Sequence, residues 1–190
     1  MILCTIQTPP AWRSLRTTGV LRADSHRIEP NFLPAYRWMA KQLVHRVGPP
    51  PSGVRYPIWA WQRPKPDLRR SGHLPHNLPG VLIQFAATPD SVLLSDFHGW
   101  HCVLNRWHLP RTQDAERAFL ARVRRSGVNE QHAWSLPWAR ASITRSWEKI
   151  FDLTWSNPDW VPQPQEKAVQ ACIWQIDRSQ VRTVQSFVAR

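Results

Sequence analysis

The sequence predicts one α+β domain spanning residues 1–190, with a mixed, mostly antiparallel sheet flanked by helices. Helical patterns are concentrated early and in the middle of the chain, whereas strand patterns occur at both ends and centrally. Such an order fits α+β better than a regular β–α alternation. A length of 190 residues suits one sizeable domain, and 42% hydrophobic residues are enough for a packed core.

The first elements are marked by helix-capping residues. Residues 3–7 (LCTIQ) are expected to form a strand. Thr8 can cap the helix that follows, since two prolines are tolerated in its first turn, and Gly19 can end it. Residues 31–47 carry apolar side chains three and four apart, which predicts a second helix.

The pattern at the centre of the chain predicts mainly strands. Residues 54–61 (VRYPIWAW) predict a strand that leads into a polar, proline-rich connection. Residues 80–87 and 91–95 are expected to be buried strands. Three helices should follow, at residues 97–107, 112–127 and 137–151, the first of them capped by Ser95 or Asp96. The chain should close with two strands, at residues 167–176 and 181–188.

Charge and cysteine content limit which partners and which compartment the sequence predicts. The net charge is +12, with 21 Arg against 4 Lys. This surplus favours polyanionic partners such as a nucleic acid or nucleotide. The alternative is that a high-GC genome produces the Arg-rich, Lys-poor balance, since the charges are spread along the chain. Cys4, Cys102 and Cys172 predict reduced core residues of a cytoplasmic protein. No apolar run predicts a membrane span, and the start lacks the pattern of a signal peptide.

Tryptophan is unusually frequent, at 12 of 190 residues. Trp59 and Trp61 fall on one face of a strand, and Tyr56 and Ile58 alternate with them. The pair could stack on a nucleobase or a nicotinamide ring, or it could form a core wall between sheet and helix.

The segment 95–105 (SDFHGWHCVLN) offers polar side chains on a helix. Asp96 can cap this helix, Trp100 belongs to its apolar stripe, and His101 and Asn105 lie four apart on its polar stripe. The histidines here lack a third placed ligand, so we predict no metal site. The whole chain lacks motifs for a phosphate-binding loop, a dinucleotide fold or a serine hydrolase, which counts against those enzyme classes. An enzyme whose site consists of scattered side chains stays possible, so it is open whether the protein is an enzyme.

Several motifs lie along nearly the whole chain, from Leu3 to Arg190: the AYRWM helix, YPIWAW with KPDLR, VLLSDF, WEKIFDL and VQACIW. Together they resemble a bacterial family, domain of unknown function 3841. The resemblance implies a single domain and brings no established activity.

The order of the pieces is also similar to that of ADP-ribosyltransferase-like proteins, which implies NAD as a cofactor. In that superfamily a first strand carries a His or Arg that binds NAD, an aromatic strand lies near the nicotinamide, and a late strand presents a catalytic Glu. Here Thr5 and Gln7 stand on the first strand, and Gln170 stands on the last. A neutral amide supplies little charge to a developing cation.

We therefore expect a cytoplasmic, ADP-ribosyltransferase-like domain whose cleft engages a nucleotide or nucleic acid. The alternative is a non-catalytic nucleic-acid-binding or protein-interaction module of a defence or toxin–antitoxin system. Catalytic candidates are Thr5, His101 and Gln170, and the ligand-binding candidates are Gln7, Tyr56, Trp59, Trp61, Arg69, Arg70, Asp96, Trp100 and Asn105. Arg69 and Arg70 are expected to contact phosphate.

Overall fold

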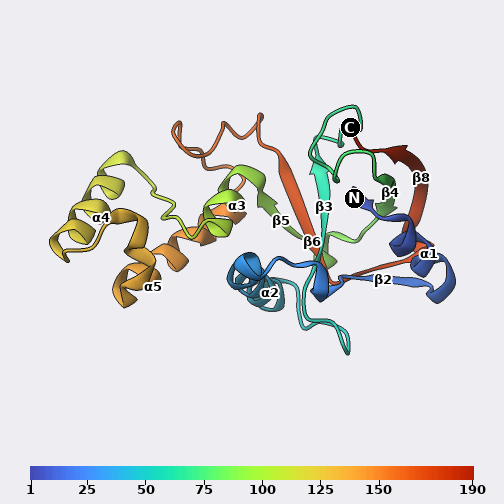
Figure 1. Cartoon of the computed structure of the whole chain (residues 1–190), viewed down its shortest axis with the longest axis horizontal. Coiled ribbons are helices and arrows are strands. Elements are labelled where there is room, and N and C mark those ends of the chain that lie inside the picture. Colours follow the sequence, from blue (N-terminus) through green and yellow to red (C-terminus); the bar gives the residue numbers. More distant parts are fainter. The chain divides into compact units, whose positions relative to one another are not determined.

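The computed structural model describes residues 1–190, whose contacts group into two compact units. The first unit comprises Met1–Leu94 and Val169–Arg190, and the second comprises Ser95–Ala168. Figure 1 traces both units along the chain. The predicted α+β class, with a mostly antiparallel sheet and accompanying helices, is confirmed.

A six-stranded sheet dominates the first unit, in the order β5-β6-β3-β1-β4-β8. Antiparallel pairing joins β1 to β3 and β4, β3 to β6, and β4 to β8. The strands are β1 (Ile2–Gln7), β3 (Ile58–Arg63), β4 (Pro79–Ala86), β5 (Leu93–Asp96), β6 (Val169–Ile173) and β8 (Val181–Val188). A separate two-stranded sheet pairs β2 (Val20–Arg22) with β7 (Gln175–Asp177).

One face of the large sheet carries the main hydrophobic core. Leu3 of β1, Ile58 and Ala60 of β3, and Phe85 of β4 are buried there with Leu15 of α1. Successive side chains of a strand point to opposite faces, so Trp59 and Trp61 lie on the other face of β3. Both are half-buried.

Helix α1 (Pro9–Thr18) has the predicted boundaries, because its ends are determined locally. Thr8 caps the first turn, and its hydroxyl accepts a hydrogen bond from the amide of Ala11. Gly19 ends the helix at φ 81°, a left-handed conformation that glycine adopts without strain. The second predicted helix is present as α2 (Leu33–Arg46), preceded by 3-10 turns at Ser25–Arg27 and Pro30–Phe32.

The second unit consists largely of helices. They are α3 (Phe97–Leu104), α4 (Gln113–Arg125) and α5 (Pro137–Ser146), with 3-10 segments at Glu130–Ser135 and Trp147–Phe151. Asp96 caps α3, as predicted, and Thr112 caps α4 at the predicted start of that helix. None of the helices in either unit combines the length and the apolar character needed to cross a membrane.

Two of the strand predictions were wrong in their extent. The strand expected at 54–61 begins only at Ile58, directly after Pro57, whose ring lacks the amide hydrogen needed for pairing. The strand expected at 167–176 is divided into β6 and β7, which pair with different partners. Trp174 lies between them and donates its indole hydrogen to the carbonyl of Gly48 at 2.9 Å.

Candidate functional site

A cleft of about 880 Å³ opens in the first unit where β1 ends and β3 begins. Antiparallel pairing of Cys4 with Trp61 brings the last residues of β1 beside the first residues of β3. The remaining walls come from α1, β2, the 3-10 turn that follows it, and α2. Ligand pockets commonly have volumes of roughly 300–1,000 Å³, so this cleft is large enough for a nucleotide.

Aromatic side chains form one wall of the cleft. The ring of Trp59 meets that of Tyr36 edge to face, with centroids 5.8 Å apart. Tyr36 makes a second edge-to-face contact with Tyr56, which lies outside the cleft lining, with ring centroids 6.4 Å apart. Burial, with a smaller contribution from Cys172, raises the pKa of the Tyr36 hydroxyl, which therefore stays protonated and remains a hydrogen-bond donor.

A short chain of hydrogen bonds fixes the polar floor of the cleft. The buried hydroxyl of Thr5 donates to the backbone carbonyl of Trp59 at 2.8 Å. The amide nitrogen of Gln7 donates to the Thr5 oxygen, also at 2.8 Å. With its nitrogen so engaged, the Gln7 carboxamide is held in one orientation, and its oxygen remains an acceptor for a ligand.

Two arginines make the rim of the cleft basic. Arg22 donates only to neutral oxygens, those of Gln175 and Ser52, at 3.3 Å each. Arg27 reaches the hydroxyl of Thr8 at 3.4 Å and lies 3.7 Å from the carboxylate of Asp24. Since Asp24 contributes the cleft's one carboxylate, the lining keeps a net positive charge.

The adjacent start of α1 has no free amide to offer an anion. Its first two residues are Pro9 and Pro10, which have no amide hydrogen. The amides of Ala11 and Trp12 bond to the hydroxyl and carbonyl of Thr8. An anion in the cleft would therefore depend on the two arginines and not on the helix terminus.

The structure brings two of the predicted ligand-binding residues, Gln7 and Trp59, into this cleft. Thr5 is buried and does not line the cleft, and Tyr56 contacts the ring of Tyr36. Trp61 and Gln170 face each other farther along the sheet, in register on β3 and β6, outside the cleft lining. Gln170 is 7% exposed, and its side-chain oxygen has no hydrogen-bond partner.

Arg69 and Arg70 are held by a carboxylate of their own loop. Asp67 lies 2.9 Å from the Arg69 guanidinium and 3.8 Å from that of Arg70. Hydrogen bonds from Arg69, together with its charge and that of Arg70, lower the pKa of Asp67 to about 2. From this connection it is Leu74, and not the arginine pair, that lines the cleft.

The other four predicted residues belong to the second unit. Trp100 is buried in α3, and His101 is exposed with its ring 4.7 Å from that of Phe97. Asn105 caps the end of α3, where its side chain donates to the carbonyl of His101 at 2.8 Å. Asp96 is 1% exposed and caps the start of the helix by accepting from the Gly99 amide at 2.6 Å.

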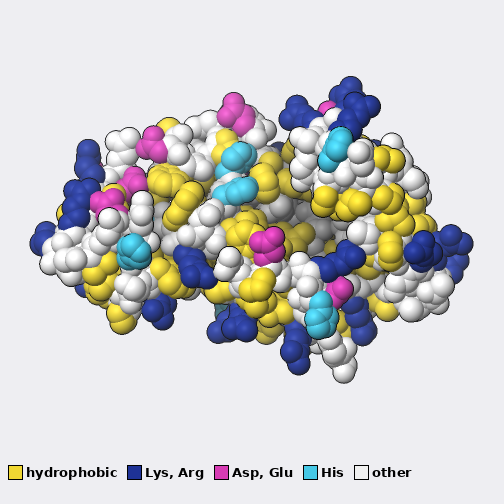
Figure 2. Space-filling model, viewed as in Figure 1, with side chains coloured by type: hydrophobic (Ala, Val, Ile, Leu, Met, Phe, Trp, Pro, Cys, Tyr) yellow, Lys and Arg dark blue, Asp and Glu magenta, His cyan; other side chains and the backbone are white.

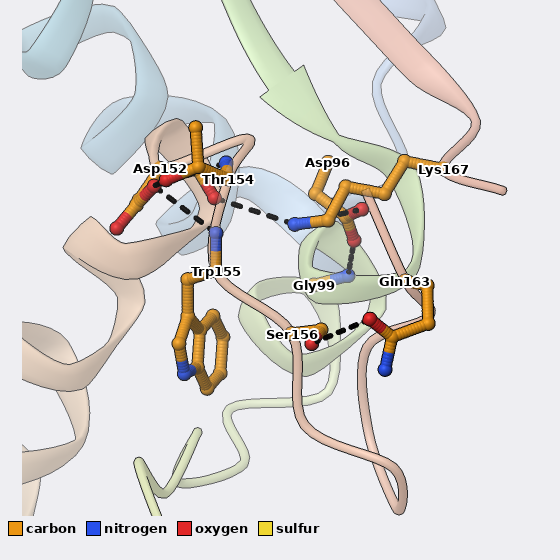
Figure 3. Close-up of polar contacts among 8 residues, drawn as sticks. All are labelled: Asp96, Gly99, Asp152, Thr154, Trp155, Ser156, Gln163 and Lys167. Atoms are coloured by element: carbon orange, nitrogen blue, oxygen red, sulfur yellow. Dashed lines mark hydrogen bonds and ion pairs between the residues drawn. The ribbon is translucent and has the colours of Figure 1, made fainter. Parts of the chain in front are cut away.

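A buried ion pair involves Asp96 and a residue that the sequence did not single out, Lys167 (Figure 3). The Lys167 ammonium lies 3.8 Å from the Asp96 carboxylate, and both side chains are at most 1% exposed. The same ammonium donates to the backbone carbonyl of Asp152 at 3.3 Å. The pair thus links the start of α3 to the segment that follows α5, and its complete burial indicates a structural role.

A second cavity of about 470 Å³ lies within the second unit, next to His108 and Trp160. The His108 ring stacks on Phe119 with centroids 4.1 Å apart. Its Nδ1 and the indole nitrogen of Trp160 are buried without protein partners. Burial, with a contribution from Lys149, lowers the pKa of His108 to about 4, so the ring is neutral at pH 7.

Sequence reasoning missed Arg22, Arg27 and Tyr36 as cleft residues. Tyr36 lies among the apolar side chains that predict the helix at 31–47, and the arginines follow α1 in a stretch without a recognisable motif. Only the run GVLRADSHR, two arginines within a few residues of the helix end, could have suggested a basic rim.

Together, fold and site define an α+β protein with an aromatic and basic cleft at the ends of two central strands of its sheet, β1 and β3. The chain belongs to the family described as Domain of unknown function (DUF3841), whose profile matches residues 2–182. No curated protein and no solved structure matches the chain. The similarity to ADP-ribosyltransferases therefore gains no support from these comparisons.

Proposed function

We propose that the protein binds a nucleotide in the cleft between β1, β3 and α1. The observation that carries this proposal is the presence, in one cavity, of an aromatic wall, an oriented carboxamide and two arginines. Trp59 and Tyr36 suit the flat face of a base, because every base has a π surface that stacks on aromatic rings.

The arginine rim suits the phosphate end of the same ligand. A guanidinium binds phosphate oxygens through two parallel N–H groups, and Arg22 has no carboxylate partner that would compete. Gln7 would accept a hydrogen bond from an amino or hydroxyl group between the base and the phosphate. Its amide is already oriented by Thr5, which lowers the entropic cost of binding.

The proposal concerns binding, with NAD as one nucleotide to test. Transfer of ADP-ribose passes through a cationic sugar that a carboxylate would stabilise. The one carboxylate of the lining, Asp24, caps a 3-10 turn and contacts Arg27. The neutral Gln7 fits a role in recognising a ribose better than one in stabilising a cation.

The test is calorimetric titration of the protein with adenosine, AMP, ADP and NAD. We expect ADP to bind more tightly than adenosine. The double variant Arg22→Gln/Arg27→Gln should weaken ADP binding by about tenfold or more, since a hydrogen bond to a charged group contributes about 1.5–3 kcal/mol. Adenosine binding should be unchanged. The matched control is Arg69→Gln/Arg70→Gln, which removes the same charge from exposed side chains outside the cleft.

Trp59→Leu tests the base-binding wall independently. It should weaken adenosine and ADP by a similar factor, roughly tenfold, because base stacking contributes about 1–3 kcal/mol. The proposal fails if none of these ligands binds at millimolar concentration, or if the rim and control variants lower ADP affinity equally.

A further inference from the structure

Three arginines gather at an exposed groove beside α1. Arg13, Arg16 and Thr17 of this helix line a groove of about 300 Å³ with Arg178, which follows β7. All four side chains are exposed, and no carboxylate lies within ion-pair distance of any of the three guanidinium groups. In Figure 2 a group of basic side chains occupies the position where Figure 1 draws α1.

The backbone fixes this arrangement. Arg13 and Arg16 are three residues apart and therefore share a helix face. Pairing of β2 with β7 places Arg178 beside the helix end, where its amide donates to the carbonyl of Gly19 at 2.8 Å. The Arg178 side chain donates from one nitrogen to the carbonyl of Arg16 at 3.2 Å.

Favourable interaction with the helix end explains part of this clustering. A cation near the C-terminus of a helix is stabilised by about 0.3–1 kcal/mol. One arginine would supply that, whereas three in one groove repel one another. The Arg178 guanidinium has further N–H groups that remain available to a ligand. Thr17 adds a hydroxyl at the groove wall. Such a set of donors fits a phosphate group.

The groove and the cleft are both lined by residues of α1. Ser14 and Thr18 of α1 line the cleft, and Arg13 and Thr17 line the groove. The helix that contributes to both sites is about 10 Å across. A ligand with one base in the cleft could therefore lay its neighbouring phosphates in the groove.

We propose that the ligand is single-stranded nucleic acid, with an unstacked base in the cleft and the adjoining backbone phosphates on Arg13, Arg16 and Arg178. This inference rests on the proposed nucleotide binding and extends it to a polymeric ligand. A duplex is disfavoured because its bases are paired and must be extruded before one can enter a pocket.

The test is fluorescence anisotropy with a labelled ten-nucleotide single strand of mixed sequence, as DNA and as RNA, between 50 and 200 mM salt. Three phosphate contacts contribute a slope of about −2 in log affinity against log salt, since each contributes about −0.7. The variant Arg13→Gln/Arg16→Gln/Arg178→Gln should reduce the magnitude of the slope by about 2 and weaken oligonucleotide binding by tenfold or more at 50 mM salt.

A charge-matched control is Arg55→Gln/Arg69→Gln/Arg70→Gln, which alters three exposed arginines of the same unit outside both sites. It should leave the slope within about 0.5 of the wild-type value. ADP affinity measured by calorimetry should be the same in the groove variant and the wild type, which distinguishes the two proposals.

Each outcome has one meaning. If ADP binds but the groove variant and its control affect the oligonucleotide equally, the inference is overturned and nucleotide binding stands. A duplex that competes as well as the single strand also overturns it. If neither ADP nor the oligonucleotide binds, both proposals fail.

Discussion

Replacing Lys167 by Met should cost more stability than any change to a surface charge of this protein. The substitution keeps the length and apolar stem of the side chain but removes the ammonium that faces Asp96 at 3.8 Å. The Asp96 carboxylate is 1% exposed, and its second oxygen has no hydrogen-bond partner to replace the lost charge. Removal of one partner from a buried pair typically costs about 3–5 kcal/mol.

The double variant Asp96→Asn/Lys167→Met should be more stable than Lys167→Met alone. Asparagine caps helices about as well as aspartate, so the bond to the Gly99 amide is retained. Both buried charges are then absent, and replacing a whole pair is often neutral or nearly so. We expect the double variant to regain about 2 kcal/mol or more of the stability that Lys167→Met loses. Two independent losses would instead add and make the double variant less stable.

Urea unfolding at pH 7, followed by tryptophan fluorescence and far-ultraviolet circular dichroism, measures both effects. With a slope of about 2 kcal/mol per molar urea, a loss of 3 kcal/mol lowers the midpoint by about 1.5 M. The control is Arg117→Met, which breaks an exposed ion pair with Asp114 in the same unit and should cost at most about 1 kcal/mol. If Lys167→Met is no worse than this control, or if the double variant is less stable than either single variant, the reasoning about the buried pair is refuted.

Two further changes probe packing and protonation. The pKa of His108 is about 4 in the folded protein and about 6.5 when unfolded, so stability should fall as the pH drops from about 6.5 towards 4. His108→Gln should flatten that part of the curve of urea midpoint against pH; parallel curves would contradict it. Gly80→Ala should cost about 1–3 kcal/mol, because the added methyl group overlaps the ring of Phe187 and approaches Leu74 within 2.8 Å. The loss should shrink in a Phe187→Ala background, and equal losses in both backgrounds would count against this clash.

Helix ends were predictable because capping chemistry is local. Thr8 and Asp96 cap their helices as the sequence indicated, by accepting from amides three residues ahead. Gly19 ends α1 for an equally local reason, its left-handed backbone. Each of these signals is contained within one turn of chain, so no knowledge of the tertiary fold was required.

Strand limits and the choice of buried face were harder to predict. The alternation around Trp59 and Trp61 showed that they share a face, but a period of two does not reveal which face meets the core. The structure buries Ile58 and Ala60 in the core and leaves the tryptophans half-buried on the other side. That choice depends on Leu15 of α1 and on neighbouring strands, which a single segment does not encode.

The cleft was only partly predictable for the same reason. Gln7 and Trp59 stood out by residue type and position. Arg22 stands on β2, whose pairing with β7 a single segment does not predict, and Arg27 stands in the 3-10 turn that follows. The prediction that Arg69 and Arg70 contact phosphate rested on their adjacency. It did not consider Asp67, whose carboxylate binds both guanidinium groups.

The position of Asp67 distinguishes two kinds of arginine in the first unit. Arg69 and Arg70 have an anion within their own loop, so an incoming phosphate would have to compete with it. Arg22 donates to neutral protein oxygens. The arginines of the α1 groove likewise have no carboxylate partner. A phosphate bound there gains the full attraction of the guanidinium and displaces no ion pair. Phosphate affinity should therefore follow the partners of each arginine, and not the local density of basic residues in the sequence.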